Sequence, residues 1–259
     1  LPPLLLYSKW SQIALNISSA VSMCLLSNTE RLFQMTLAGH LGAFLQAILA
    51  RLRDDGCQVA AMEVSSIGLA LRRADELPFA VGVFTGLSRD HLDFHADMDD
   101  YLAAKRRLFS ELIRTDGRAI LNADDPAAAA TTARAPVWTY SRRGPADIAA
   151  SQSEFSLHGI RAVLSTPAGS GQLSMSMIGS HNLENALAAV GAALAVGLPL
   201  EAILAGLASL PHVPGRLERV ENTAGVHVLV DYAHTPDALR RVLTTLRPPT
   251  PGRALAVFG

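Results

Sequence analysis

The sequence predicts an α/β fold: a mostly parallel sheet flanked by helices, an antiparallel hairpin at one sheet edge, and the start of a second, Rossmann-like α/β domain. Three observations predict it. Short continuous apolar runs alternate with helical patterns, which indicates parallel strands buried on both faces. The pattern then changes to alternating residues, which is typical of an antiparallel hairpin. A proline- and glycine-containing segment at 211–215 precedes a further strand and helix.

Four short apolar runs are expected to form the parallel strands. The first two end in polar or turn-forming pairs, Ser65-Ser66 and Thr85-Gly86. Runs of this kind indicate strands that are buried on both faces, because a half-exposed strand would alternate with polar residues. The four strands are expected at Val59–Val64, Phe79–Phe84, 119–122 and 137–140.

Helical spacing marks residues 98–113, where apolar side chains recur on one face. Asp97 is expected to cap this helix, with Asp100 three residues further on. Alternating residues over 155–177, interrupted by Pro-Ala-Gly-Ser-Gly, predict the antiparallel hairpin at the edge of the main sheet. Two more helices are expected at 183–196 and 200–207.

The segment 211–215 is expected to link two domains. After it, a strand at 226–230, a helix at Pro236–Leu246 and a strand at 254–258 would begin the second domain. We therefore expect three parts: an atypical segment 1–44 without clear periodicity, a central domain 45–213, and the beginning of a C-terminal domain at 214–259.

Composition argues against several classes of function. The chain has 259 residues, 49% apolar and 17% charged, so a buried core is expected and disorder is not. A formal net charge of −1 gives no electrostatic reason to expect nucleic acid or a membrane as partner. The two cysteines lack metal-ligand spacing and fit a reducing compartment. No apolar run reaches the ~20 residues of a membrane span. We expect a cytoplasmic monomer.

Glu63 and His91 follow neighbouring predicted strands. Glu63 lies where one strand ends, and the segment TGLSRDHLDFH, which holds His91, follows the next. Ligands of open parallel sheets bind beyond the carboxyl ends of the strands. A carboxylate there suits Mg²⁺, and a histidine could bind a metal or a phosphate. The residues alone leave open a glutamate paired with an arginine and a polar capped loop.

Lys105 is one of only two lysines among the 22 basic residues, the other being Lys9. It borders the buried face of its helix, four residues after Tyr101. A lysine near apolar surface loses its charge more easily, because desolvation disfavours the ammonium. A neutral amine can add CO₂ to form a carbamate, which can bind a metal, whereas arginine stays protonated. A solvated helix lysine is the alternative.

Four further residues are candidates for nucleotide binding. Asn182 and Asn185 share a face in the first turn of a predicted helix, where their amides could cap the helix or contact a base. Asp231 ends a predicted strand before a proline-initiated helix. Arg216 follows the linker and could contact a phosphate between the domains. An ordinary strand–loop–helix turn and a surface arginine are the alternatives.

Six stretches together resemble the Mur ligase family. They follow the family order from about residue 45 to residue 259, over four fifths of the chain, and their combination is highly specific. The match is to the branch that adds the third residue to UDP-N-acetylmuramoyl-dipeptide. The stretches are AMEVSSIGL, FTGLSRDHLDFHADMDDYLAAKRRLF, ILNADDP, IGSHNLENALAA, PGRLERV and VLVDYAHTPDAL.

The resemblance implies an ATP-dependent amide ligase. The dipeptide carboxylate would take the γ-phosphoryl group of ATP, and an amine would attack the resulting acyl phosphate, with Mg²⁺ stabilising the charge. The added residue would be meso-diaminopimelate, with lysine as the alternative. By position, Glu63 and His91 match Mg²⁺ ligands and Lys105 a carbamylated lysine, while Ser65 and Arg73 match contacts to the UDP-sugar dipeptide. Asn185 resembles the adenine-side asparagine; Arg216 and Asp231 resemble ATP contacts.

The sequence departs from the family pattern at several points. It contains no G-x-x-G-K-[ST] loop, which by spacing would fall at or just before residue 1. Residues 1–44 also lack the paired threonines expected upstream, and a mispredicted start would explain both. Ile67 replaces a histidine, and Gly86 replaces an asparagine and is expected to loosen the loop that carries His91. Two other hypotheses remain: a catalytically impaired fragment of such a ligase, and a metal-dependent hydrolase. Because the phosphate loop is missing, we expect the 259-residue chain alone to be inactive.

Overall fold

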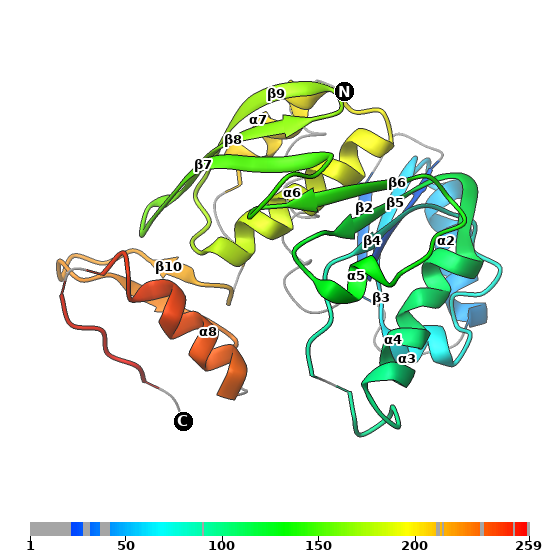
Figure 1. Ribbon diagram of the computed structural model, residues 1–259, viewed down its shortest axis with the longest axis horizontal. Coiled ribbons are helices and arrows are strands. Elements are labelled where there is room, and N and C mark those ends of the chain that lie inside the picture. The colour runs from blue at the N-terminus through cyan, green and yellow to red at the C-terminus, as the bar shows by residue number, and fades with distance from the viewer. Residues whose placement is uncertain are drawn as a thin grey trace.

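A nine-stranded sheet dominates this computed structural model, in the strand order β2-β3-β1-β4-β5-β6-β7-β8-β9 (Figure 1). The structure describes residues 22–27, 32–36, 42–89, 91–210, 213, 215–233, 236–250 and 252–257. The elements up to the sixth strand are β1 (Ser22–Ser27), β2 (Leu32–Thr36), α2 (Gly42–Asp54), β3 (Val59–Val64), α3 (Ser66–Ala70), β4 (Phe79–Phe84), α4 (Met98–Arg107), the π-helix η2 (Leu108–Leu112), β5 (Ile113–Asn122), α5 (Pro126–Ala129) and β6 (Val137–Ser141).

The remaining elements complete the sheet and add a second, smaller one. They are β7 (Ile148–Ser156), β8 (Gly159–Thr166), β9 (Gly169–Met175), α6 (Ser180–Ala195), α7 (Leu200–Ala208), β10 (Glu218–Val220), β11 (Val228–Val230) and α8 (Pro236–Leu246). The bounds of β3, β4 and α8 agree with the sequence-based prediction.

The main sheet is mostly parallel, as predicted. β2 pairs with β3 in parallel, and β4, β5, β6 and β7 form a second parallel run. β7, β8 and β9 are antiparallel and form one edge, which confirms the edge hairpin and adds β7 to it. β1 is antiparallel to both β3 and β4 and lies between them. The apolar pattern did not predict β1 and β2, which lie within segment 1–44.

Helices cover both faces of the sheet, and side chains alternate between two cores. Ala61 of β3 and Ile120 of β5 pack with α6 and α7 on one face. Their sequence neighbours Met62 and Leu121 pack on the other face, together with Leu69 of α3 and other side chains from α2, α4 and η2. Because successive residues of a strand point to opposite faces, continuous apolar runs are what this arrangement requires.

The predicted helix 98–113 is helical to residue 112, but its last turn is the π-helix η2. Asp97 caps α4 as expected, and its side chain accepts a hydrogen bond from the Asp100 amide at 2.8 Å. β5 then begins at Ile113, six residues before the predicted start. Its first half carries exposed polar residues 114–116, which interrupt the apolar run and hid the strand from the pattern.

The segment 215–257 forms a separate part of the fold, seen below the main sheet in Figure 1. β10 and β11 pair antiparallel as a two-stranded sheet, and α8 follows. The predicted strand at 254–258 is wrong over 254–257, where the structure has no regular element; Phe258 lies outside the described residues. Leu255 and Val257 are 81% and 97% exposed. Apolar composition does not make a strand unless a neighbour pairs with it.

None of the described helices combines the length and apolar character needed to cross a membrane.

Candidate functional site

Glu63 lies within electrostatic reach of three side chains from distant parts of the chain. It is the fifth residue of β3 and is partly buried. Burial raises the pKa of the Glu63 carboxyl. Electrostatic interactions with Lys105, Arg216 and His91 lower the same pKa, but burial has the larger effect. These residues come from α4, the segment after residue 213 and the loop after β4. Three of the sequence-predicted site residues therefore act electrostatically on the fourth.

Lys105 is buried in the last turn of α4, with 2% of its surface exposed. Its Nζ donates a hydrogen bond to the Gly86 carbonyl at 3.3 Å. The same nitrogen lies 5.1 Å from the ring centroid of Tyr101 and 5.9 Å from that of Phe84. The alternative of a solvated helix lysine is therefore wrong. A desolvated amine in an aromatic pocket has the surroundings that its proposed modification needs.

His91 lies in the loop after β4, with the positive φ of 55° that is uncommon for a non-glycine residue. Its ring contacts the ring of Tyr101 edge-on, with centroids 5.8 Å apart. The described residues contain no cluster of three or more histidine, cysteine, aspartate or glutamate side chains suited to hold a metal. Mg²⁺ usually takes only one or two carboxylates and completes its shell with water and phosphate oxygens. A site built from Glu63 and His91 would therefore need water and phosphate oxygens to complete it.

The loop that carries His91 is held at its start. Lys105 binds the Gly86 carbonyl, and the Leu87 amide donates to Asp125 Oδ2 at 2.6 Å. Gly86 has φ of +156°, and a Cβ at this position would lie 3.0 Å from the same carboxylate. The start of this loop is thus held at two neighbouring residues, Gly86 and Leu87; that Gly86 loosens the rest of the loop stays a prediction.

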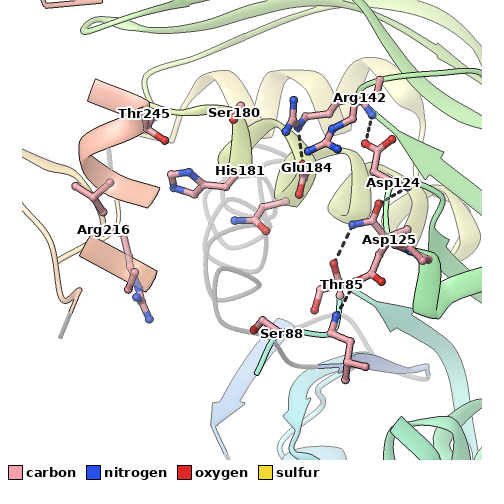
Figure 2. A pocket seen from close by; sticks show the side chains of 18 of the residues that line it. Thr85, Ser88, Asp124, Asp125, Arg142, Ser180, His181, Glu184, Arg216 and Thr245 are labelled. Atoms are coloured by element: carbon pink, nitrogen blue, oxygen red, sulfur yellow. Dashed lines mark hydrogen bonds and ion pairs between the residues drawn. The ribbon is translucent and has the colours of Figure 1, made fainter. Parts of the chain in front are cut away.

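A cavity of about 550 Å³ lies where the carboxyl ends of the strands face α6 and α8 (Figure 2). Asn185, Arg216 and Asp231 all line it, so the structure brings the three predicted nucleotide contacts together. Ser65 and Arg73 are not among its lining residues. The labelled side chains in Figure 2 show the mixed character of the walls: Thr85, Ser88, Asp124, Asp125, Arg142, Ser180, His181, Glu184, Arg216 and Thr245.

Asn182 and Asn185 have different roles at the start of α6. Asn182 is buried, and its Nδ2 donates to the Ile178 carbonyl at 2.8 Å. Asn185 lines the cavity, and its Nδ2 donates to Asn182 Oδ1 at 3.2 Å. Asn182 therefore orients the helix start and the neighbouring amide, whereas Asn185 is the one of the pair that reaches the cavity wall.

The sequence interpretation missed the acidic pair Asp124-Asp125. Both residues follow β5 and line the cavity. Asp125 caps α5, and its Oδ1 accepts from the Ala127 amide at 2.8 Å. Asp124 accepts from the Ser141 hydroxyl at 2.6 Å and from the Arg142 amide at 2.9 Å. The signal was present in ILNADDP, since the strand-exit argument used for Glu63 applies equally to the end of this strand.

Arg142 and Glu184 were also missed, because they are 42 residues apart and neither belongs to a local motif. Arg142 Nε donates to Glu184 Oε1, which joins the end of β6 to α6 across the cavity wall. Tyr140 of β6 joins this region to β4, because its buried hydroxyl donates to the Phe84 carbonyl at 3.2 Å. Burial, and then the charges of Glu184, Asp125 and Asp124, raise the pKa of Tyr140 well above its usual value, so it remains a donor.

Asp231 and Arg216 reach the cavity from the segment 215–257. The Asp231 carboxylate binds two backbone amides. Its Oδ2 accepts from the Leu217 amide and its Oδ1 from the Ala233 amide, both at 2.9 Å. The Tyr232 amide donates to the Gly215 carbonyl at 2.8 Å. These bonds bring the start and end of the β10–β11 pair together, and Arg216 lies between two of the bonded residues.

Ser65 and Arg73 lie on a different structural unit, α3 and the turn after it. Ser65 is the N-cap of α3, and its hydroxyl accepts from the Gly68 amide at 3.0 Å. Within the described part of the chain, the Arg73 guanidinium has no hydrogen-bond or ion-pair partner. Beside them, Ser66 Oγ lies 2.9 Å from His95 Nε2, a buried contact between α3 and the loop that precedes α4.

Residues 32–193 match the Mur ligase middle domain, and residues 215–259 match the glutamate ligase domain of Mur ligases. This chain belongs to the Mur ligase family. The middle-domain match begins within segment 1–44, at the start of β2.

Two relatives illustrate the sequence similarity. A UDP-N-acetylmuramoyl-L-alanyl-D-glutamate--2,6-diaminopimelate ligase of Gloeobacter violaceus is 48% identical over 217 residues. The enzyme of the same name from Geobacter sulfurreducens is 47% identical over 222 residues. In each case the match covers 83% of this chain and 44% of the relative, so the chain spans less than half the length of these Mur ligases.

Solved structures agree with the sequence comparison. A UDP-N-acetylmuramoyl-L-alanyl-D-glutamate--2,6-diaminopimelate ligase aligns over 93% of this chain and 51% of its own, with a TM-score of 0.74 and 27% identity. A MurF ligase from Thermotoga maritima in complex with ADP aligns over 93% of this chain and 54% of its own, with a TM-score of 0.64. At 17% identity, the second likeness concerns the fold alone.

Proposed function

We propose that this chain is the nucleotide-binding core of an ATP-dependent amide ligase that adds meso-diaminopimelate to UDP-N-acetylmuramoyl-L-alanyl-D-glutamate. The observation that carries the proposal is that Asn185, Arg216 and Asp231 line one cavity, with the buried Lys105 bonded to the carbonyl of Gly86 on its wall. The names of the Gloeobacter and Geobacter relatives support the choice of substrates. The proposed domains are a segment 1–44, whose strands β1 and β2 join the sheet of the central domain, the central domain 45–213, and the beginning of a Rossmann-like C-terminal domain at 214–259.

In this proposal the cavity receives ATP. Asn185 contacts the adenine, while Arg216 and Asp231 contact the triphosphate and ribose side from the opposite wall. An arginine stabilises phosphoryl oxygens by paired, charge-assisted hydrogen bonds. The dipeptide carboxylate attacks the γ-phosphorus, ADP leaves, and the amine of the incoming amino acid then displaces phosphate from the acyl phosphate. Positioning and charge stabilisation supply most of the acceleration in such transfers.

Glu63 and His91 would hold Mg²⁺, which neutralises charge on the phosphates when it is bound. Lys105 is proposed to be carbamylated, which changes a buried cation into an anion beside the proposed metal ligands. Arg106, the adjacent residue of α4, could not be modified in this way because a guanidinium stays protonated. Ser65 and Arg73 are proposed to contact the UDP-sugar dipeptide.

The test measures phosphate release with ATP, UDP-N-acetylmuramoyl-L-alanyl-D-glutamate and meso-diaminopimelate, and with each omitted in turn. Release that requires all three supports the ligase, whereas release without ATP would sink it and favour a metal-dependent hydrolase. Binding of Mg-ATP in calorimetry without turnover would identify a catalytically impaired chain. Lysine in place of diaminopimelate tests the alternative added residue.

A matched pair of variants isolates the lysine. Where turnover is detectable, Lys105→Arg is expected to lower it by about 100-fold or more, the loss typical for one preorganised stabilising group, whereas Arg106→Lys should retain it. Labelling with ¹³C-bicarbonate adds a readout that does not depend on activity. A carbamate carbon signal in the protein and in Arg106→Lys, but not in Lys105→Arg, is expected. Equal signals in both variants would contradict the assignment.

A further inference from the structure

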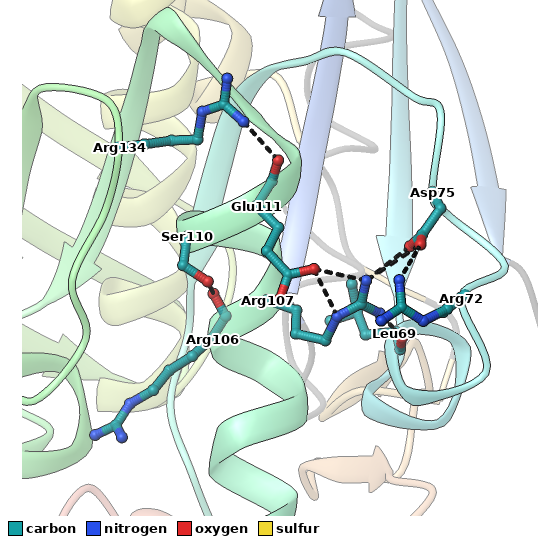
Figure 3. A network of polar contacts seen from close by, with 8 residues as sticks. All are labelled: Leu69, Arg72, Asp75, Arg106, Arg107, Ser110, Glu111 and Arg134. Atoms are coloured by element: carbon teal, nitrogen blue, oxygen red, sulfur yellow. Dashed lines mark hydrogen bonds and ion pairs between the residues drawn. The ribbon is translucent and has the colours of Figure 1, made fainter.

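A network of arginines and carboxylates ties α3 and its following turn to α4 and η2 (Figure 3). Its centre is Arg107, the last residue of α4, whose side chain is only 15% exposed. The guanidinium donates through NH1 to the Leu69 carbonyl, at the end of α3. Through NH2 it donates to both carboxylate oxygens of Asp75, at 3.0 and 3.2 Å. One side chain therefore bridges segments 32 and 38 residues away in the sequence.

Arg107 is itself held on its own helix. Its Nε and NH2 donate to Glu111 Oε2 at 3.0 and 2.8 Å. Glu111 belongs to the π-helix η2, and its carbonyl accepts from Arg134 NH1 at 2.8 Å. Single π-helical turns are rare and frequently occur at functional sites. With two carboxylates and a carbonyl around it, the guanidinium is fixed in one orientation.

The turn after α3 requires such support because its backbone is strained. Arg72 and Glu76 have φ of 56° and 69°, in the left-handed region that non-glycine residues rarely adopt. Residues in this conformation persist only when surrounding contacts over-determine them. Asp75 supplies the contacts, because it binds Arg107 and also Arg72 NH1, at 3.1 Å.

The network leaves one cation of the turn available. Arg72 and Arg107 share the Asp75 carboxylate and Arg107 also pairs with Glu111, so two cations are matched by two anions within the network. Arg73, between Arg72 and Ala74, takes no part in it. The other end of α3 is anchored too, since the buried His95 lies 2.9 Å from Ser66 Oγ and 3.1 Å from Asp100 Oδ2 of α4. The segment from Ser65 to Asp75 is thus attached at both ends to the helix that carries Lys105.

From this arrangement we infer that Arg107 is a positioning residue for the acidic UDP-sugar substrate. It holds the strained turn against α4 and occupies Asp75, so that Arg73 is presented to the substrate rather than captured by its neighbour. The inference rests on the proposed function, because it takes Arg73 as a contact to that substrate. Arg107 itself touches no reacting group in this scheme.

The test compares Arg107→Ala, Arg107→Lys and Asp75→Asn with a control, Arg114→Ala. Arg114 pairs with Asp116 two residues away on an exposed part of β5, so its loss breaks an ion pair that links no separate elements. Calorimetry measures affinity for UDP-N-acetylmuramoyl-L-alanyl-D-glutamate and, separately, for ATP. Arg107→Ala is expected to weaken the UDP-sugar about tenfold, the effect of one lost charge-assisted hydrogen bond, and to leave ATP affinity unchanged.

Arg107→Lys keeps the positive charge but loses the planar set of guanidinium donors, so an intermediate loss of UDP-sugar affinity is expected. Combining Arg107→Ala with Asp75→Asn should weaken binding by less than the sum of the two single losses, since both changes break the Arg107–Asp75 pair and only Asp75→Asn also weakens the Arg72 contact. Hydrogen exchange provides a readout without substrate. The amides of Arg72, Arg73, Asp75 and Leu77 bond within the turn, and faster exchange of these amides is expected in the Arg107 variants but not in Arg114→Ala.

The outcomes separate the two ideas. UDP-sugar binding equal to that of the unmodified protein in all variants would overturn the inference, as would equal losses for UDP-sugar and ATP, which would indicate general destabilisation. If the unmodified protein itself fails to bind the UDP-sugar, the proposed function fails. The exchange rates then decide whether Arg107 holds the turn: unchanged rates would overturn that as well. If Arg107→Ala does not fold, Arg107→Lys and Asp75→Asn carry the same comparisons.

Discussion

The main sheet with its helices and the segment 215–257 differ in how they hold their share of the site. In the first, Lys105 and Asn185 are buried between helices and a sheet whose two faces are both packed. In the second, apolar side chains along both strands and the following loops are exposed. They include Val226, Val228, Val230, Tyr232, Leu255 and Val257. Side chains of the first region are positioned by packing, and those of the second by local hydrogen bonds.

This difference bears directly on the proposed nucleotide site. Arg216 and Asp231 are held by backbone contacts of Gly215, Leu217 and Ala233, not by a core. Regions with few buried contacts open locally at low free-energy cost, and moving parts of enzymes are drawn from them. The wall formed by Asn185 is expected to be the fixed one, and the wall formed by Arg216 the adjustable one.

The largest expected difference is between two leucine-to-alanine substitutions. Leu187 of α6 is fully buried, whereas Leu255 is exposed. Leu187→Ala should lower the free energy of unfolding by about 2–5 kcal/mol, because it removes buried methylenes and leaves a cavity. Leu255→Ala should change it by no more than about 0.5 kcal/mol. Urea unfolding followed by circular dichroism measures both. A loss above about 2 kcal/mol for Leu255→Ala would show that this segment packs as the main sheet does.

A second comparison uses two glycines with positive φ. Gly159, in the β7–β8 turn, has φ of +136°, and a Cβ there would lie 2.1 Å from the Met175 carbonyl oxygen. Gly225, between β10 and β11, has φ of +70° and open space around it. Gly159→Ala should cost about 2–3 kcal/mol, because backbone strain and a clash combine. Gly225→Ala should cost about 1 kcal/mol from the backbone alone. Similar losses in thermal unfolding would mean that β8 and β9 can separate to accept the methyl group.

The smallest effect concerns the pH dependence of stability through Glu63. Because burial raises the pKa of Glu63 in the folded state, that state binds more protons than the unfolded chain between the ordinary pKa of 4.5 and the raised value. Stability from this group is therefore greatest below pH 4.5 and falls as pH rises through that window. Glu63→Gln should remove the fall, measured by urea unfolding between pH 4 and 7 with EDTA present. Glu201→Gln, an exposed change on α7, is the control.

The same titration tests whether the two regions meet. Arg216 lowers the pKa of Glu63 in opposition to burial, so Arg216→Gln should raise that pKa further and widen the window. An unaltered pH profile in Arg216→Gln would place Arg216 away from Glu63 in solution. That result would contradict the wall that the segment 215–257 contributes to the cavity.

Much of the fold could be predicted because the evidence for it is local. Val59–Val64 and Phe79–Phe84 are continuous apolar runs, and β3 and β4 have those bounds. Prediction failed where local signals were weak or misleading. Polar residues 114–116 concealed the first half of β5, and the apolar residues 254–257 suggested a strand for which the structure has no paired neighbour.

The sequence by itself determined the chemistry available at the strand exits: a carboxylate at Glu63, a rare lysine at Lys105, and an asparagine pair opening a helix. Only the tertiary structure decided which groups meet. It brought Arg216 within electrostatic reach of Glu63, 153 residues away in the sequence. It also joined Leu69, Asp75 and Glu111 through the side chain of Arg107. Periodicity and capping act within a few residues, whereas ion pairs between distant segments depend on how helices pack on the sheet.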